Sequence, residues 1–294
     1  MFDKNHLNDF YRFKIGRFDC RSVSDGTYDY DPMHIFPADM TEAQVKEVLR
    51  NHNVQTDEII SPYTFLFVDT GDQKILVDMG AGKLGPNTGK LLVNLKAAGI
   101  QPEEIDTIFI THAHPDHIGG TLDDQGKPNY PNARYYICKD EWNFWFSDEA
   151  SGKVTEHLSQ LLPTEVFMKI ARGQLGPVKD RIELITEESE IIQGIRVQFT
   201  PGHTPGHMVV SFSSEGEELF NVGDAILFPF LIERPDLRPI VDIIPDMADA
   251  SKRKLFDLLA KRNAWVLAQH FHPFPSLGHI VKKGEGWQWQ PVEL

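Results

Sequence analysis

Cysteine is scarce in this chain of 294 residues, which contains only Cys20 and Cys138. The two lie far apart in the sequence, and neither belongs to a Cys-x-x-Cys pair, the spacing typical of thiolate zinc sites and dithiol redox centres. A fold that depends on several disulfide bonds is therefore excluded. A single disulfide stays open as an alternative, but we expect two reduced, buried thiols in a cytoplasmic enzyme.

Long apolar runs are also missing. No segment approaches the roughly 20 consecutive apolar residues that a membrane-spanning helix needs. Residues 1–6 lack the apolar core of a secretory signal peptide. We therefore expect a cytoplasmic protein without a membrane partner.

Basic residues are outnumbered, with 29 Lys and Arg against 43 Asp and Glu, and the net charge is −14. Proteins that bind duplex nucleic acid normally present a basic face, so we expect no nucleic-acid partner. Apolar residues make up 41% of the chain, which is enough for a full hydrophobic core. The chain is longer than most single domains, but a β sandwich of this length can form one domain.

What the chain does contain is a cluster of metal-ligand side chains at residues 111–120, with the sequence Thr-His-Ala-His-Pro-Asp-His-Ile-Gly-Gly. It directly follows an apolar run typical of a buried strand, so it lies where a strand ends and α/β folds place their ligands. Alternate residues of an extended segment point to the same side, which aims His112 and His114 at one point. Pro115 can open a helix that turns Asp116 and His117 toward them. Two sets of ligands fit two metal ions better than one; a polar loop with clustered histidines is the weaker alternative.

Further strand ends in the second half carry side chains of the same kinds. The expected strands cover residues 195–199, 218–222 and 265–268. They lead to His203, to Asp224, and to either His270 or His272. In isolation, His203 would be as typical of a turn as of a metal site, and Asp224 would be an ordinary turn acid. We favour His270 over His272 because it follows its strand directly, and we expect His207 to face away from the site.

The pattern His-x-His-x-Asp-His followed by Gly-Gly resembles the signature of the metallo-β-lactamase superfamily of metallohydrolases. Over residues 11–294 the chain is most similar to methyl parathion hydrolase and its relatives, which grade into the N-acyl homoserine lactonases. Besides the metal loop, the segments that carry the resemblance are residues 76–82, 89–99, 143–147, 273–279 and 284–292. The resemblance implies an α+β fold in four layers, an αββα sandwich. We expect a single domain over residues 1–294, with an N-terminal arm at about residues 1–20 and a helical insert at about residues 139–173.

The resemblance also implies a dinuclear metal site. One ion would be held by His112, His114 and His203, the other by Asp116, His117 and His270, and Asp224 would bridge the two. Asp78, at the end of an expected strand, would hydrogen bond to this site without binding metal. Imidazole and carboxylate ligands fit zinc, which we favour, but also iron, manganese or cobalt. Two such ions can hold a bridging hydroxide near neutral pH and polarise a substrate oxygen, and Asp116 and Asp224 would orient the hydroxide.

The segments around the site predict a small, neutral substrate. No Lys or Arg lies in residues 111–120, 200–207 or 221–230, so a clamp for dianionic phosphates is missing. Aromatic residues are frequent instead, and we expect Trp145 and Phe228 to contact an ester, a lactone or a phosphotriester. Leu227 stands where lactonases often carry a tyrosine, which weakens a strict lactonase assignment.

Two other functions stay open. One is an oxidoreductase such as a sulfur dioxygenase, with a single iron on the same fold, and the other is a metal-binding protein without catalysis. The aromatic residues at 142–146 and in the N-terminal arm exceed what one face can bury. We therefore expect a homodimer in which the arm crosses to the partner.

Overall fold

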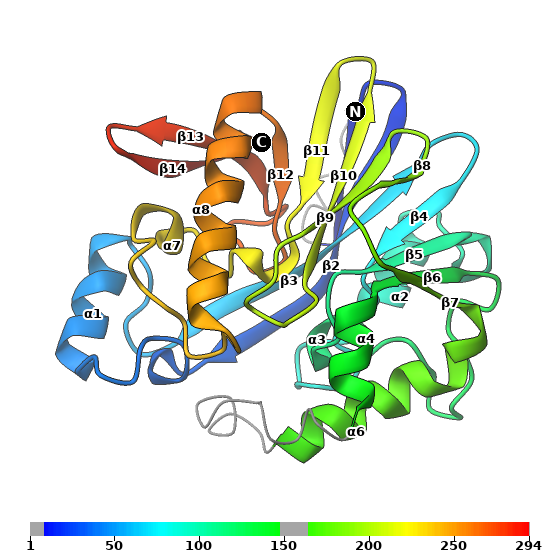
Figure 1. Cartoon of the computed structure of the whole chain (residues 1–294), viewed down its shortest axis with the longest axis horizontal. Coiled ribbons are helices and arrows are strands. Elements are labelled where there is room, and N and C mark those ends of the chain that lie inside the picture. Colours follow the sequence, from blue (N-terminus) through cyan, green and yellow to red (C-terminus); the bar gives the residue numbers. More distant parts are fainter. Residues whose placement is uncertain (1–8, 148–163, 294) are drawn as a thin grey trace.

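The computed structural model describes residues 9–147 and 164–293. Two seven-stranded sheets pack against each other, and helices cover the outer face of each sheet (Figure 1). The resulting order of helices, sheet, sheet and helices is the four-layer αββα sandwich predicted from the sequence.

The first sheet has the order β1-β2-β3-β4-β5-β6-β7. Its strands are β1 (Phe10–Ile15), β2 (Phe18–Tyr30), β3 (Ile59–Asp69), β4 (Lys74–Val77), β5 (Thr107–Ile110), β6 (Arg134–Cys138) and β7 (Ile182–Ile185). Pairing is antiparallel from β1 to β4 and parallel from β4 to β7. The carboxyl ends of β4 and β5 therefore lie side by side, and the loops that follow these strands meet there.

The second sheet has the order β14-β13-β12-β11-β10-β9-β8. Its strands are β8 (Glu190–Ile192), β9 (Ile195–Phe199), β10 (Met208–Ser214), β11 (Glu217–Asn221), β12 (Trp265–Leu267), β13 (Leu277–Lys283) and β14 (Gly286–Pro291). β11 and β12 form its parallel pair. Their carboxyl ends therefore also lie together, and the loops after them can contribute to one site. The strand ends predicted to carry ligands are all present.

The described helices are α1 (Glu42–Asn51), α2 (Leu91–Ala97), α3 (Pro115–Ile118), α4 (Lys139–Phe146), α6 (Thr164–Leu175), α7 (Phe230–Glu233) and α8 (Pro245–Arg262). α1 begins with a capping box, in which the Thr41 side chain accepts from the Gln44 backbone N–H and the Gln44 side chain accepts from the Thr41 backbone N–H. α8 begins at Pro245, whose fixed φ fits the first position of a helix.

Three apolar layers hold the sandwich together. One lies between the sheets, one between the first sheet and its helices, and one between the second sheet and α8. β5 shows how the sequence produces this arrangement. Ile108 and Ile110 face the helices, whereas Phe109 faces the second sheet, because side chains alternate along a strand. A strand buried on both faces is apolar at every such position, as predicted.

The predicted N-terminal arm at about residues 1–20 overlaps the first sheet. Residues 10–15 form β1, an edge strand paired with β2. The part of the arm at residues 1–8, including Phe2, lies outside the described residues. Tyr11 and Phe13 pack partly against the layer between the sheets. The crossing of an arm to a partner chain stays a prediction.

The predicted helical insert contains α4 and α6, and residues 148–163 between them lie outside the described residues. The aromatic residues of α4 pack in two directions. Phe144 and Trp145 are buried, whereas Trp142 and Phe146 are partly buried and stack on each other with ring centroids 3.7 Å apart. The homodimer predicted from these rings stays a prediction.

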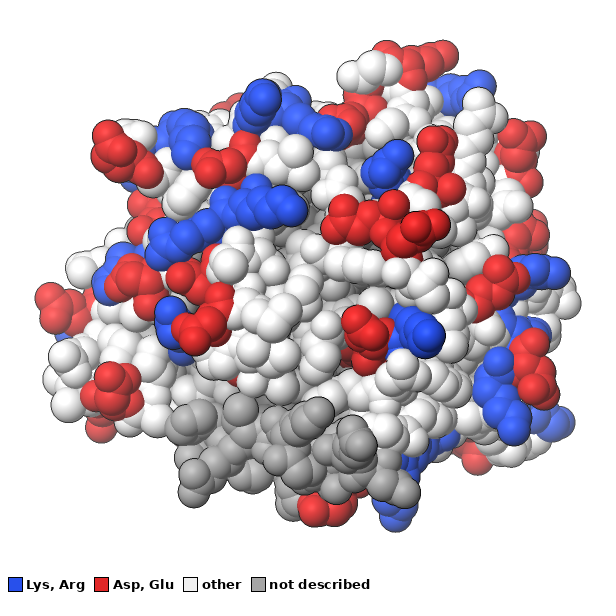
Figure 2. Space-filling model, in the orientation of Figure 1, with Lys and Arg blue, Asp and Glu red and all other residues white. Residues whose placement is uncertain are grey.

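The described surface carries both signs of charge. On the face shown in Figure 2, basic side chains alternate with acidic ones. Among the described residues, several charged side chains form ion pairs, such as Lys282 with Asp257 and Arg262 with Glu218. Among the described helices, none is both long and apolar enough to span a bilayer.

Candidate metal centre

Side chains from four loops meet where strands of both sheets end. The loop after β5 and the short helix α3 carry the histidine motif, and the loops after β9, β11 and β12 carry the remaining residues. These side chains form two groups that share Asp224, and within each group the ligand atoms lie within 4.8 Å of one another. The first group is His112, His114, His203 and Asp224, and the second is Asp116, His117, Asp224 and His270.

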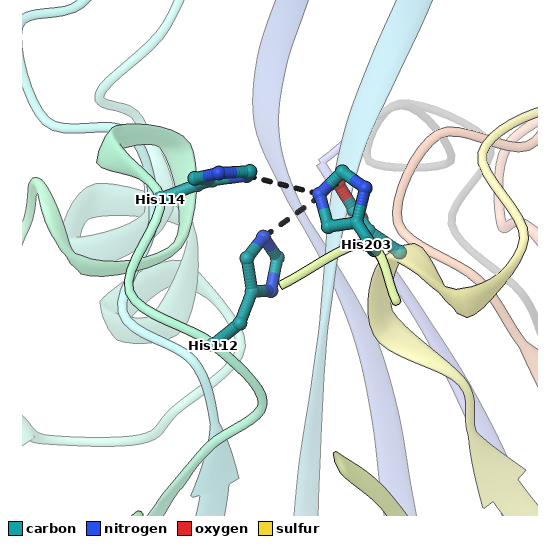
Figure 3. Close-up of side chains that lie close together, drawn as sticks. His112, His114 and His203 are labelled. Carbon is teal, nitrogen blue, oxygen red and sulfur yellow. Dashed lines mark hydrogen bonds and ion pairs between the residues drawn. The ribbon is translucent and has the colours of Figure 1, made fainter. Parts of the chain in front are cut away.

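The first group contains three imidazoles that face one another (Figure 3). His203 Nε2 lies 2.9 Å from His114 Nδ1 and 3.4 Å from Asp224 Oδ2. His112 Nε2 lies 3.8 Å from the same carboxylate oxygen. All four side chains are buried. Three imidazoles and one carboxylate around a common point form a set that divalent transition metals bind.

The second group lies on the other side of the Asp224 carboxylate. Asp224 Oδ1 is 3.2 Å from His117 Nε2, and His270 Nε2 is 3.3 Å from both oxygens of Asp224. Asp116 Oδ2 completes this group at 3.5 Å from His270 Nε2. The carboxylate of Asp224 thus lies between the two groups, in the place that a bridging ligand would occupy.

Two of the histidines have carboxylate partners on the side away from the groups. His117 Nδ1 lies 2.7 Å from Asp78 Oδ2, and His203 Nδ1 lies 3.0 Å from Asp242 Oδ1. A carboxylate only accepts hydrogen bonds, so each Nδ1 donates. The neutral imidazole then has its lone pair on Nε2, the nitrogen that faces the groups. The supporting role predicted for Asp78 matches this contact.

Two further histidines have hydroxyl partners. His112 Nδ1 lies 3.1 Å from Thr111 Oγ1, and His270 Nδ1 lies 2.9 Å from Ser61 Oγ. The Thr111 hydroxyl donates to Asp78 Oδ2 at 2.7 Å, so it accepts from His112. The Ser61 hydroxyl donates to the Pro62 carbonyl and accepts from His270 in the same way. In their neutral form, these four imidazoles direct Nε2 lone pairs inward.

Several inward-facing atoms lack the partners that buried polar groups normally have. His112 Nε2, His117 Nε2 and Asp224 Oδ1 are buried with no hydrogen-bond partner among the described residues. Burial, together with neighbouring histidines, holds the pKa values of His112 and His114 well below the usual range, so both are neutral. Buried lone pairs and a carboxylate that face one another are costly unless a cation lies between them. The residues present therefore fit two divalent metal ions.

The Gly-Gly that ends the motif allows the loop to pack closely on the end of β4. A Cβ atom on Gly120 would lie 2.1 Å from the carbonyl oxygen of Met79, and one on Gly119 would lie 2.3 Å from that of Ala81. A side chain cannot be accommodated at either distance. The two glycines thus keep the histidine loop next to Asp78, whose carboxylate accepts hydrogen bonds from Thr111 and His117 of this loop.

The remaining histidines lie outside both groups. His207 Nε2 accepts a hydrogen bond from the Asp224 backbone N–H at 3.0 Å, so it supports Asp224 instead of joining a group. Burial lowers the pKa of His207 to about 3, which keeps it neutral and able to accept. His272 is exposed and contacts the carbonyl of Ile60. Of the two candidates for the last ligand, the structure therefore brings His270 to the site.

The prediction that Trp145 contacts substrate needs correction. Trp145 is fully buried, its Nε1 donates to Glu141 at 2.7 Å, and its ring meets that of His114 edge to face at 5.7 Å. It thus lies behind a candidate ligand and does not line the pocket. Phe228 does line the pocket, 6.1 Å from the ring of His270. Spacing along the chain could not show that the cavity lining includes no residue of α4.

A cavity of about 430 Å³ opens onto both groups. Its walls are mostly aromatic and aliphatic, and its lining includes Tyr28, Tyr30, Ile35, Tyr63, Leu84, Phe167, Leu227, Phe228 and Val241. The charged side chains in the lining are carboxylates, with Asp29 and Asp31 added to Asp116 and Asp224. Among the described residues, no Lys or Arg lines this cavity.

Several residues of the site carry no recognisable sequence signal. Asp242 and Ser61 come from loops and strands far from the histidines that they contact. The hydroxyls of Tyr30 and Tyr63 lie 2.6 Å apart at the cavity wall. The contact of Ser61 in β3 with His270 after β12 depends on how the two sheets pack, and the other contacts join segments that are distant in the sequence. Only Thr111, which directly precedes the motif, had a position that could have suggested its role.

The fold and the two ligand groups define a class of protein that comparison with known proteins identifies. Residues 61–270 match the family model of the metallo-beta-lactamase superfamily. The chain belongs to this superfamily.

Three similar proteins illustrate which members of the superfamily this chain resembles. An N-acyl homoserine lactonase of Bacillus thuringiensis is 24% identical over 178 residues, which is 60% of this chain and 60% of that protein. The crystal structure of AbOPH, a hydrolase in the beta lactamase superfamily, is 31% identical with a TM-score of 0.88, covering 97% of this chain and 98% of that one. AidC, a dizinc quorum-quenching lactonase solved with a product, is 30% identical with a TM-score of 0.86 and the same coverage. The chain thus spans about 60% of the length of this curated relative.

Proposed function

We propose that this chain is a dinuclear metal-dependent hydrolase that opens neutral lactones or esters, with acyl lactones as the first candidate class. The observation that carries the proposal is the pair of ligand groups that share Asp224 on the floor of an apolar cavity. Support comes also from AidC, which is a dizinc lactonase, and from the lactonase of Bacillus thuringiensis.

When bound, two divalent ions would supply a water nucleophile activated near neutral pH and would polarise the substrate carbonyl. The residues of the chain perform the remaining tasks. His112, His114 and His203 would hold the first ion, and Asp116, His117 and His270 the second. Asp116 and Asp224 can accept hydrogen bonds from the nucleophile and orient it toward the carbonyl carbon. Zinc fits this ligand set and is our first choice.

The cavity lining favours a neutral substrate. Its carboxylates would repel an anionic substrate. Its described walls contain no Lys or Arg that could offset the charge of a phosphomonoester. The walls formed by Phe167, Leu227 and Phe228 can bury an acyl chain or an aryl ring. An aryl phosphotriester is also neutral and is therefore part of the proposed range.

A panel assay of the metal-loaded protein tests this function. We expect turnover of acyl lactones, and also of aryl esters or aryl phosphotriesters, because these are neutral and apolar. A phosphomonoester with the same aryl group should react at least about 100-fold more slowly, since no cation among the described residues neutralises it. Fastest turnover of the phosphomonoester would refute the proposed specificity. Thiol-dependent oxygen uptake by protein with one bound iron would instead favour the dioxygenase.

Replacement of Phe228 with leucine tests the cavity wall. Phe228 lines the cavity and stacks on Phe230, with ring centroids 5.4 Å apart. The variant would lose the contact between the Phe228 ring and the aryl group of the substrate. Such a ring contact is worth about 0.5–1.5 kcal/mol, so KM for aryl substrates should rise about two- to tenfold. The KM for a small aliphatic lactone on the same variant should change less, and kcat should stay within about twofold because the ligands are intact. Equal changes for both substrates would contradict the assigned role of Phe228.

A further inference from the structure

A buried carboxylate near the site contacts neither the cavity nor the inward-facing atoms of the two groups. Glu141 lies in the first turn of α4 and is fully buried. Its Oε1 accepts from the backbone N–H of Ala113 at 2.8 Å and from Trp145 Nε1 at 2.7 Å. Its Oε2 accepts from Thr204 Oγ1 at 2.6 Å and from the backbone N–H of Gly206 at 3.0 Å. Each oxygen therefore receives two donors.

Apart from Trp145, which lies in α4 itself, the donors come from two loops that are far apart in the sequence. Ala113 lies between His112 and His114, and Thr204 follows His203 directly. Glu141 thus connects the two segments that carry all three histidines of the first group. Its donors do not include the neighbours of Asp116, Asp224 or His270.

The loop of His203 also packs very closely on the start of α4. A Cβ atom on Gly206 would lie 2.1 Å from the backbone nitrogen of Glu141, so only glycine fits there. The contact between this loop and α4 is therefore part of the backbone packing. It brings the Gly206 N–H within hydrogen-bond distance of the carboxylate.

No ion pair to Glu141 is present among the described residues, so hydrogen bonds alone compensate its buried charge. Four donors saturate a carboxylate, whereas a glutamine has only one acceptor oxygen. With that oxygen toward Ala113 and Trp145, the glutamine NH₂ would face the Gly206 N–H, which cannot accept. The Thr204 hydroxyl can turn and accept. A glutamine should therefore disturb the loop of His203 more than that of His112.

We propose that Glu141 is a positioning residue that holds the His112–His114 loop and the His203 loop at the spacing required by the first metal ion. The proposal rests on the proposed function only in assuming that both groups bind metal. A partner in the shell around the ligands typically contributes about 10–100-fold to metal affinity. Glu141 should contribute selectively, to one ion of the two.

Metal release from the loaded protein, measured by competition with a chromophoric chelator, tests this role. We expect Glu141→Gln to raise the dissociation constant of one of the two bound ions about 10–100-fold. The dissociation constant of the other ion should stay within about threefold of its wild-type value. In the cobalt-loaded protein, the absorption of one ion should change and that of the other should persist. Thr204→Val, which removes a single bond to the His203 loop, should act in the same direction. Trp145→Phe removes the bond that stays within α4 and should have the smallest effect.

Equal weakening of both ions in Glu141→Gln would overturn the proposal. A lower melting temperature with unchanged affinity for both ions would overturn it as well, because Glu141 would then only stabilise the fold. If Glu141→Gln does not fold, Thr204→Val decides on the same criteria. A wild-type protein that binds two ions but hydrolyses no neutral substrate would refute the proposed function alone, since metal release reports on Glu141 independently.

Discussion

Replacement of Asp224 with asparagine is expected to lower kcat about 1,000-fold and to weaken the binding of both metal ions. Asp224 lies between the two groups, with Oδ2 3.4 Å from His203 Nε2 and Oδ1 3.2 Å from His117 Nε2. An asparagine keeps one oxygen but loses the negative charge, so it cannot serve two cations equally. A loss of about 4 kcal/mol of transition-state stabilisation corresponds to this factor. Steady-state kinetics and metal analysis of the same preparation measure both effects.

Asp116→Asn is the matched comparison, because Asp116 belongs to the second group alone. The Asp116→Asn variant should bind one ion more weakly and bind the other as the wild-type protein does. The contrast is informative because both changes remove one carboxylate charge from the same site. If Asp224→Asn also released only one ion, or if kcat fell by less than about tenfold, Asp224 would not be a bridge.

Replacement of His270 with alanine should remove one metal ion and lower activity by about 100-fold or more. The expectation follows from its contacts, since His270 Nε2 lies 3.3 Å from both oxygens of Asp224 and 3.5 Å from Asp116 Oδ2. Loss of a ligand weakens the charge stabilisation that the ion supplies, which is worth several kcal/mol. Metal content and kcat are the measurements.

The chain offers a control for this change two residues further on. His272 is exposed and contacts only the carbonyl of Ile60 among the described residues. His272→Ala should therefore keep both ions and most of the activity. An exchange of the two outcomes, with His272→Ala losing metal, would mean that the loop after β12 presents the other histidine.

Local spacing was sufficient to place the histidine motif. An apolar strand, an extended His-x-His and a proline that opens a turn determine together that Asp116 and His117 return toward His112. The strand ends before His203, Asp224 and His270 could also be predicted, because the strands are short apolar runs with clear ends. That all of them meet at one point followed only from the family resemblance, since no single-sequence pattern encodes the packing of one sheet on another.

The parts that could not be predicted depend on contacts between segments that are far apart in the sequence. The partners of the ligands, such as Asp242 for His203 and Ser61 for His270, lie 39 and 209 positions away in the sequence. The error at Trp145 has the same origin. Aromatic residues occur on two faces of α4, and the packing of the His203 loop on Glu141 is one of the contacts that fix this helix behind the ligands.

In the fold, too, elements with a clear local sequence pattern could be predicted and elements with a weak pattern could not. β1 and β2 follow from alternation around a turn, and the hairpin of β13 and β14 follows from Gly284 and Gly286. The edge strands β7 and β8 were missed because they are short and partly exposed, so their apolar pattern is weak.

The most direct test of the dinuclear centre is a titration of metal-free protein with zinc, in which bound metal and lactone hydrolysis are measured together. The structure predicts that binding saturates at two ions per chain and that hydrolysis reaches its maximum only with the second ion. Saturation of both binding and activity at one ion per chain would contradict the shared role of Asp224 and the account built on it.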